Sequence, residues 1–251
     1  MAVLGDELFV LFNGRVENHV EVFRATTSTH ELLRRITVPG LQRNDAEDLA
    51  ACRRNNCLYV ADSGRNCVHR LSPTIADRWP SSVRKWKVPG EPCGLSVTPD
   101  GNLVVVCRGK VSRLMLLSAG DGKLIMREIK LSSDITGAFQ AVMLASGQFL
   151  ICQHGLPGLY QVDSDGTVTQ TYRGAGRTRL KCPCHVTIDA DDDHVFVADH
   201  DHHRVAMLSL SSSLRFVSDV IELSLPSRLC ADYVTGRLYV GHGCDVTVIQ
   251  P

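Results

Sequence analysis

The sequence predicts an all-β fold, a six-bladed β-propeller with about 46 residues in each blade. Three observations lead to this prediction: an apolar pentapeptide that occurs six times, turn signals before its copies, and no sustained helical periodicity. The copies begin at Leu8, Leu58, Leu103, Phe149, Val195 and Leu238. Their spacing is 43 to 50 residues, and repeats of about 40–50 residues with four short strands each are typical of propeller blades.

Each repeat is expected to contain four strands in chain order. An alternating run and a turn precede the pentapeptide, as in residues 94–101, where Asp-Gly favours a hairpin because glycine adopts positive φ without strain. A polar turn and a third strand follow it, as in Val68 to Leu71, and a fourth strand comes next, as in Val168 to Tyr172. Residues 32–35 form the main stretch with helical spacing, and they are too few for a stable helix.

The length suggests that one blade is incomplete. Six blades of this size need about 276 residues, about 25 more than the 251 present. The first inner strand contains only Ala2-Val-Leu4, and the last repeat ends after Val246-Thr-Val-Ile249. We therefore expect a single propeller domain over residues 1–251, with a closing seam where the termini meet and a closing blade that lacks a strand. A fragment of a longer protein would show the same shortfall, and this alternative stays open.

Composition excludes several classes of protein. An apolar content of 44% with 27 basic and 27 acidic residues argues against disorder and against a strongly basic nucleic-acid binder. No apolar run reaches the ~18 residues of a membrane span, and Asp6 and Glu7 stand where a signal peptide would carry cations. Ten cysteines without an Asn-x-Ser/Thr acceptor favour reduced thiols. We expect a cytoplasmic, monomeric domain that does not bind a membrane.

Two of the repeats carry a family resemblance. Leu58-Tyr-Val-Ala-Asp-Ser-Gly-Arg-Asn-Cys-Val-His-Arg-Leu71 and Val195-Phe-Val-Ala-Asp-His-Asp-His-His-Arg-Val205 resemble NHL repeats, and the other four copies match the pattern in part. The resemblance implies a propeller of the kind found at the C-terminal end of tripartite-motif proteins, after RING, B-box and coiled-coil regions. Such propellers recognise a protein or RNA target, so the resemblance also implies the target-recognition part of a ubiquitin ligase.

Charged residues sort onto two faces. In a four-stranded blade the second-to-third turns and the blade connections emerge on one face, and the first-to-second turns emerge on the other. The first face is expected to hold Arg15, Arg65, Arg108, Lys110, Arg113, Arg173, Arg177, Arg179, Lys181 and Arg204. The second is expected to hold Asp100, Asp189, Asp191, Asp192, Asp193 and Asp232, with Arg53 and Arg54. The densest basic stretch is the connection 172–181.

We expect the basic face to bind a protein partner, and RNA binding by the same face is the first alternative. The predicted partner-binding residues are Arg65, Arg108, Lys110, Arg113, Arg173, Arg177, Arg179, Lys181, His200 and His202. A simpler explanation is that these side chains are solvated groups with no partner.

Histidines provide a second alternative. Imidazoles that converge on a channel could bind zinc, and the candidates are His154, His185, His200 and His242. Such a site would support a metal-dependent lyase or hydrolase. Because no carboxylate set accompanies them and turn histidines are common, we predict neither a catalytic residue nor a metal or other cofactor.

Two further residue types have structural interpretations. Cys52 and Cys57 flank a four-residue hairpin loop, so their Cβ atoms could lie at disulfide distance. Cys182-Pro-Cys184-His185 resembles a zinc half-site, although buried packing is the simpler explanation. Asp62 and Asp199 end the two best repeats, and we expect each to accept backbone N–H groups of the turn that follows it.

Overall fold

The structure is a computed structural model. It describes residues 1–13, 18–25, 31–42, 45–72, 82–118, 125–153, 155–189, 191, 193–211 and 213–251. Arg15, His154 and Asp192, which the sequence singles out, lie outside the described residues. The chain divides into two compact units, Met1–Glu128 and Ile129–Pro251, which are described separately below.

The first unit contains three sheets, called blades 1 to 3 in chain order. Blade 1 consists of β1 (Ala2–Leu4), β2 (Glu7–Asn13), β3 (Asn18–Arg24) and β4 (Leu32–Thr37). Blade 2 consists of β5 (Ala46–Cys52), β6 (Cys57–Asp62), β7 (Cys67–Ser72) and β8 (Ser82–Lys87). Blade 3 consists of β9 (Glu91–Val97), β10 (Leu103–Arg108), β11 (Arg113–Leu117) and β12 (Ile125–Lys130), the last of which extends past the unit boundary.

The second unit contains blades 4 to 6. Blade 4 consists of β13 (Ala138–Met143), β14 (Phe149–Gln153), β15 (Leu159–Val162) and β16 (Val168–Tyr172). Blade 5 consists of β17 (Pro183–Ile188), β18 (His194–Asp199), β19 (Arg204–Ser209) and β20 (Arg215–Glu222). Blade 6 consists of β21 (Pro226–Asp232), β22 (Arg237–His242) and β23 (Asp245–Ile249). Two short 3₁₀ turns, η1 (Gly176–Thr178) and η2 (His200–His202), lie in this unit.

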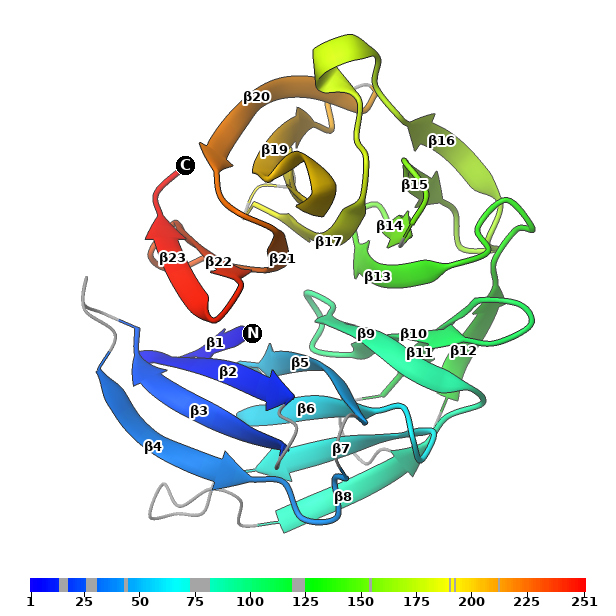
Figure 1. Cartoon of the computed structure of the whole chain (residues 1–251). Coiled ribbons are helices and arrows are strands. Elements are labelled where there is room, and N and C mark those ends of the chain that lie inside the picture. The colour runs from blue at the N-terminus through cyan, green and yellow to red at the C-terminus, as the bar shows by residue number, and fades with distance from the viewer. Residues whose placement is uncertain are drawn as a thin grey trace. The chain divides into compact units, whose positions relative to one another are not determined.

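Strands that follow one another in the chain are neighbours in every sheet (Figure 1). The six antiparallel sheets confirm the predicted all-β, six-bladed β-propeller. The three strands of blade 6 confirm that the last blade lacks a strand, and β1 is the short inner strand expected at the start of the chain. No helix among the described residues is long and apolar enough to cross a membrane.

Burial changes in a regular way across each blade. The second strands carry the repeated pentapeptide, and those of blades 2 to 5 are buried almost completely, as β6 and β18 show, whereas β2 and β22 are buried in part. The fourth strands of blades 4 and 5 alternate, so that β16 and β20 have exposed and partly buried residues in turn. A strand that is covered on both faces reads as a continuous apolar run, whereas a strand with one solvated face alternates. In blades 2 to 5 the pentapeptide therefore marks the covered centre of the blade.

Neighbouring blades of one unit share their apolar cores. In the first unit, Tyr59 and Trp86 of blade 2 belong to one buried cluster with Leu103 and Met115 of blade 3. A buried carboxylate adds a polar link, since the Asp48 Oδ2 atom accepts the Leu95 N–H at 2.8 Å. In the second unit, one cluster joins blades 4 and 5 and another joins blades 5 and 6. Each blade is thus stabilised by the adjacent blades of its unit.

All ten cysteines carry free thiols. Cys52 and Cys57 lie opposite each other across the β5–β6 hairpin, in the register that the loop length predicts, but no disulfide joins them. A hydrogen bond from the Cys57 thiol is the main cause that lowers the pKa of Cys52 to about 6. The Asn55 Nδ2 amide also donates to the Cys52 sulfur, at 3.2 Å.

The shared cores predict a large difference between buried and exposed leucines of the first unit. Leu103 is fully buried between blades 2 and 3, whereas Leu32 on β4 is 45% exposed. We expect Leu103→Ala to lower the free energy of unfolding by about 2–5 kcal/mol, because it removes packed methyl groups and leaves a cavity. Leu32→Ala should change it by no more than about 0.5 kcal/mol. Urea denaturation of both variants measures the difference, and equal losses would contradict the shared core.

Candidate functional site

The connection between β16 and β17, residues 173–182, is called the basic loop. It contains η1 and four exposed cationic side chains, those of Arg173, Arg177, Arg179 and Lys181. None of these four side chains makes a hydrogen bond or ion pair with the described residues. The loop therefore presents four positive charges that the described part of the protein does not neutralise.

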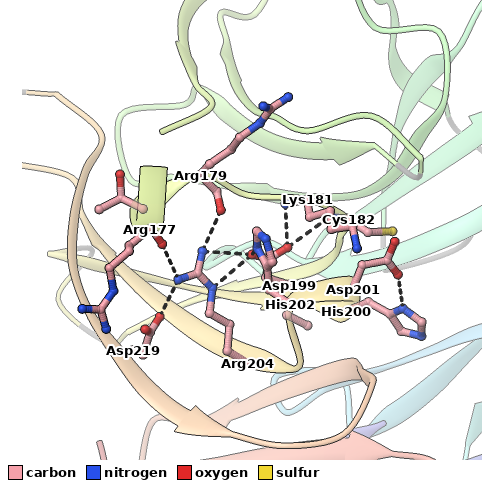
Figure 2. A network of polar contacts seen from close by, with 12 residues as sticks. Arg177, Arg179, Lys181, Cys182, Asp199, His200, Asp201, His202, Arg204 and Asp219 are labelled. Carbon is pink, nitrogen blue, oxygen red and sulfur yellow. Dashed lines mark hydrogen bonds and ion pairs between the residues drawn. The ribbon is translucent and has the colours of Figure 1, made fainter. Parts of the chain in front are cut away.

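Arg204, the first residue of β19, holds the basic loop through hydrogen bonds to its backbone (Figure 2). Its Nη1 atom donates to the Arg177 carbonyl at 2.9 Å, and its Nη2 atom donates to the Arg179 carbonyl at 2.7 Å. The Arg204 side chain is only 8% exposed. Because the carbonyls of the loop point toward Arg204, the guanidinium groups of Arg177 and Arg179 point away from it (Figure 2).

Asp199, the last residue of β18, completes this attachment. Its Oδ1 atom accepts the N–H groups of Lys181 at 2.9 Å and Cys182 at 3.0 Å. Its Oδ2 atom lies 3.1 Å from both the Nε and the Nη2 atoms of Arg204. Asp219 on β20 adds a carboxylate at 2.9 Å from Arg204 Nη1. The buried Asp199–Arg204 pair thus joins β18, β19 and β20 to the middle and the C-terminal end of the basic loop.

Two of the predicted histidines lie in η2, beside the basic loop. His202 Nδ1 is 2.7 Å from the Asp199 Oδ2 atom, and His200 Nδ1 is 2.8 Å from Asp201 Oδ1. The turn closes at His203, whose φ of 56° places it in the left-handed region. His200 and His202 are each about a third exposed, with side-chain accessibilities of 34% and 36%. The His200 N–H donates to the Cys182 carbonyl at 3.0 Å, so η2 lies against the end of the basic loop.

The predicted basic residues of the first unit differ from those of the basic loop, because most of them form ion pairs. Three of them pair with carboxylates: Arg65 with Asp45 and Asp62, Arg108 with Glu47, and Arg113 with Glu128. Lys110 is exposed. The paired arginines contribute less unbalanced positive charge than the sequence suggests, because each already has an acidic neighbour.

Arg204 and Asp199 differ from their predicted roles. Arg204 was expected on the basic face with the other cations, but it is buried. Its guanidinium group donates hydrogen bonds to Asp199 and to two carbonyl groups of the basic loop, which cover it. Asp199 does not cap the backbone of the turn after it, where its Oδ2 atom contacts only the ring of His202, and its Oδ1 atom instead accepts N–H groups of the preceding loop. Asp62 does have the expected role, since its Oδ1 atom accepts the Arg65 N–H at 3.0 Å.

A signal for the Asp199–Arg204 pair is present in the sequence. The Val-Ala-Asp motif ends one strand, and the Arg-Val motif begins the next after a four-residue turn. Antiparallel pairing then sets Asp199 directly opposite Arg204. The carbonyl groups of Arg177 and Arg179 carry no such signal, because their position depends on the path of the basic loop.

Two of the histidines considered for a zinc channel, His185 and His242, make other contacts. His185 is buried, with its Nδ1 atom 3.4 Å from the Leu229 N–H and its Nε2 atom 3.4 Å from the Gln140 amide nitrogen. His242 Nε2 lies 2.8 Å from the Thr247 hydroxyl. Among the described residues, two groups of three side chains could hold a metal, Asp62–Cys67–His69 and Cys182–His200–Asp201, and neither includes His185 or His242.

We expect Asp199→Ala to destabilise the fold far more than Asp219→Ala does. Asp199→Ala leaves Arg204 buried without its main partner, which costs about 3–5 kcal/mol of folding free energy. Asp219→Ala removes a carboxylate whose side chain is 37% exposed, so we expect a loss of about 1 kcal/mol or less. Urea denaturation of the two variants tests this, and similar losses would show that Asp199 does not anchor the loop.

Burial of His185 predicts weaker folding at acidic pH. Desolvation holds the pKa of His185 well below its usual value, and the nearby positive charge of Arg228 lowers it further. The unfolded chain takes up a proton on this residue below about pH 6.5, whereas the folded chain does not, so stability falls by about 1.4 kcal/mol per pH unit for this group. We expect His185→Gln to reduce the slope of unfolding free energy against pH between about pH 6.5 and 5. An unchanged slope would contradict the assignment.

Comparisons with known proteins identify the fold only. No family model matches the sequence, and a search of curated proteins finds no match. Solved structures that are similar include a protein of unknown function from Bacteroides caccae, with a TM-score of 0.70 and 16% identity over 94% of this chain and 82% of that one. Hydrazine synthase of Kuenenia stuttgartiensis has a TM-score of 0.66 and 15% identity over 100% and 94% of the two chains. Virginiamycin B lyase from Staphylococcus aureus has a TM-score of 0.63 and 11% identity over 98% and 82%.

Proposed function

We propose that this chain is a non-catalytic interaction scaffold of the NHL-repeat type, and that its basic loop binds an acidic segment of a protein partner. The observation that carries the proposal is the set of four exposed cations without a described acidic neighbour. Propellers often serve as interaction scaffolds, and loops on a rigid framework are where such proteins bind their partners.

The fixed backbone of the basic loop supports binding. Arg204 and Asp199 together hold the backbone at Arg177, Arg179, Lys181 and Cys182. Because the backbone is already ordered, less conformational entropy is lost when a partner binds. The same polar groups are occupied in holding the loop, which is why we propose binding and not catalysis at this place.

A protein partner is favoured over RNA by the side chains near the loop. Single-stranded nucleic acid binds through aromatic platforms on which bases stack. Tyr172, the aromatic residue nearest in sequence to the basic loop, is partly buried, and its hydroxyl donates to the Thr178 carbonyl at 2.9 Å. A run of carboxylates needs only the arginine and lysine donors that the loop offers.

The cellular role that we propose follows from the resemblance to NHL repeats. The propeller would be the target-recognition part of a tripartite-motif-like ubiquitin ligase, and the acidic segment would belong to the target. Ten free thiols support a reducing compartment such as the cytoplasm.

The double variant Arg177→Ser/Arg179→Ser tests the proposal. The carbonyl groups that bind Arg204 remain in this variant, so the fold should be retained. We expect its affinity for a fluorescein-labelled, glutamate-rich peptide to fall about tenfold or more, which corresponds to about 1.4 kcal/mol. Fluorescence anisotropy measures the affinity, and added salt should weaken the wild-type complex because the contacts are ionic.

The matched control is Arg84→Ser/Lys85→Ser, which removes two exposed cations from β8 and changes the net charge by the same amount. Its affinity should equal that of the wild type. Equal losses in both variants would mean that the peptide responds only to net charge. Binding of oligouridylate with a steep salt dependence, without binding of the peptide, would replace the protein partner by RNA.

A further inference from the structure

We propose that Cys182, His200 and Asp201 form a site for one divalent transition metal of the zinc type. One ligand atom of each residue lies within 4.8 Å of the others. Cys182 comes from the end of the basic loop, and His200 and Asp201 come from η2, so the site joins two segments that are distant in the sequence (Figure 2). This proposal is independent of the acidic partner proposed above.

The three side chains are ligands that zinc prefers. Thiolate sulfur, imidazole nitrogen and carboxylate oxygen bind Zn²⁺ at about 2.0–2.3 Å, and tetrahedral geometry then places ligand atoms about 3.3–3.7 Å apart. At most 4.8 Å separates the ligand atoms of this group, so they would close by about 1.5 Å or less to reach that geometry. A thiolate and a carboxylate also carry two negative charges, which balance the charge of the metal.

The backbone around the site is already fixed. The His200 N–H donates to the Cys182 carbonyl at 3.0 Å, and the Cys182 N–H donates to Asp199 Oδ1 at 3.0 Å. These two bonds hold the thiol-bearing residue against η2 without metal. Much of the entropy cost of bringing distant ligands together is therefore met by folding.

Exposure differs among the three residues in a way that suits an open site. Cys182 is buried, whereas the side chains of His200 and Asp201 are 34% and 44% exposed. The two partly exposed side chains leave a path by which a metal can enter from solvent. Three protein ligands leave a fourth position, which water would occupy.

The second group of potential ligands has a different character. In Asp62–Cys67–His69, His69 Nε2 lies 2.7 Å from Asp62 Oδ2, and the Cys67 sulfur lies 3.7 Å from both atoms. All three residues are at most 1% exposed. In the proposed site His200 and Asp201 also contact each other, at 2.8 Å, so the difference lies in burial, which leaves the Asp62–Cys67–His69 group no solvent-facing member through which a metal would enter. We assign this group to the packing of blade 2.

Cobalt substitution gives a direct test on the full chain. After dialysis against a chelator, the protein is titrated with Co²⁺, whose thiolate charge-transfer absorption and tetrahedral d–d bands report the ligands. We expect one equivalent to bind, with both spectral features. Cys182→Ser should abolish the charge-transfer band, and His200→Ala should weaken binding about tenfold or more, in line with the loss of one ligand.

Cys244→Ser is the control, because Cys244 is exposed and lies outside the group. It should bind Co²⁺ with wild-type affinity and spectrum. Circular dichroism checks that each variant is folded, and His200→Ala and Asp201→Asn change exposed side chains, so they test the site even if Cys182→Ser fails to fold. No bound cobalt in the wild type, or a charge-transfer band that survives in Cys182→Ser, would overturn the proposal. Because this readout uses no peptide, its result is separate from that of the binding test.

Discussion

The buried pair of Asp199 and Arg204 is the contact on which the candidate site depends. Asp199 binds the N–H groups at the end of the basic loop, and Arg204 binds the carbonyls in its middle. The pair is enclosed further by Asp219 and by the ring of Phe216, whose centroid is 5.6 Å from the Arg204 guanidinium. A buried charge pair is costly to desolvate, and it persists where further hydrogen bonds satisfy its remaining donors and acceptors. Here the backbone of the basic loop supplies these bonds.

The fold was predictable from the sequence because the repeat is carried by apolar residues. Strands such as β6, β10 and β18 are covered on both faces, so they read as short apolar runs at a regular spacing. The missing strand of blade 6 followed from the same spacing. Strand order could thus be inferred locally, since each strand pairs with the next strand in the chain.

The site was predictable only in part. That the basic loop and η2 lie together follows from blade topology, and this was expected. Whether a given arginine is exposed depends on which other segments cover it. Arg204 is buried because the basic loop covers it, with the carbonyl groups of Arg177 and Arg179 directed toward its guanidinium group. The grouping of Cys182 with His200 depends on the same loop path, which no local pattern of residues encodes.

The basic residues of this neutral chain are of two kinds, those that form ion pairs and those that do not form them with the described residues. Arg65, Arg108 and Arg113 lie against carboxylates and stabilise the first unit locally. The cations of the basic loop lack such neighbours among the described residues. A count of charges treats both kinds alike, although only the second kind offers unpaired donors to another molecule.

The shared cores have a consequence for how the protein opens. Because one apolar cluster contains residues of blades 2 and 3, and another contains residues of blades 5 and 6, no single blade of a unit encloses its own core. Detachment of one blade exposes apolar residues of its neighbour, so the smallest cooperative opening involves two blades. Amide hydrogens of central strands such as β6 and β18 should therefore exchange with solvent through the same rare event as those of the adjacent blade.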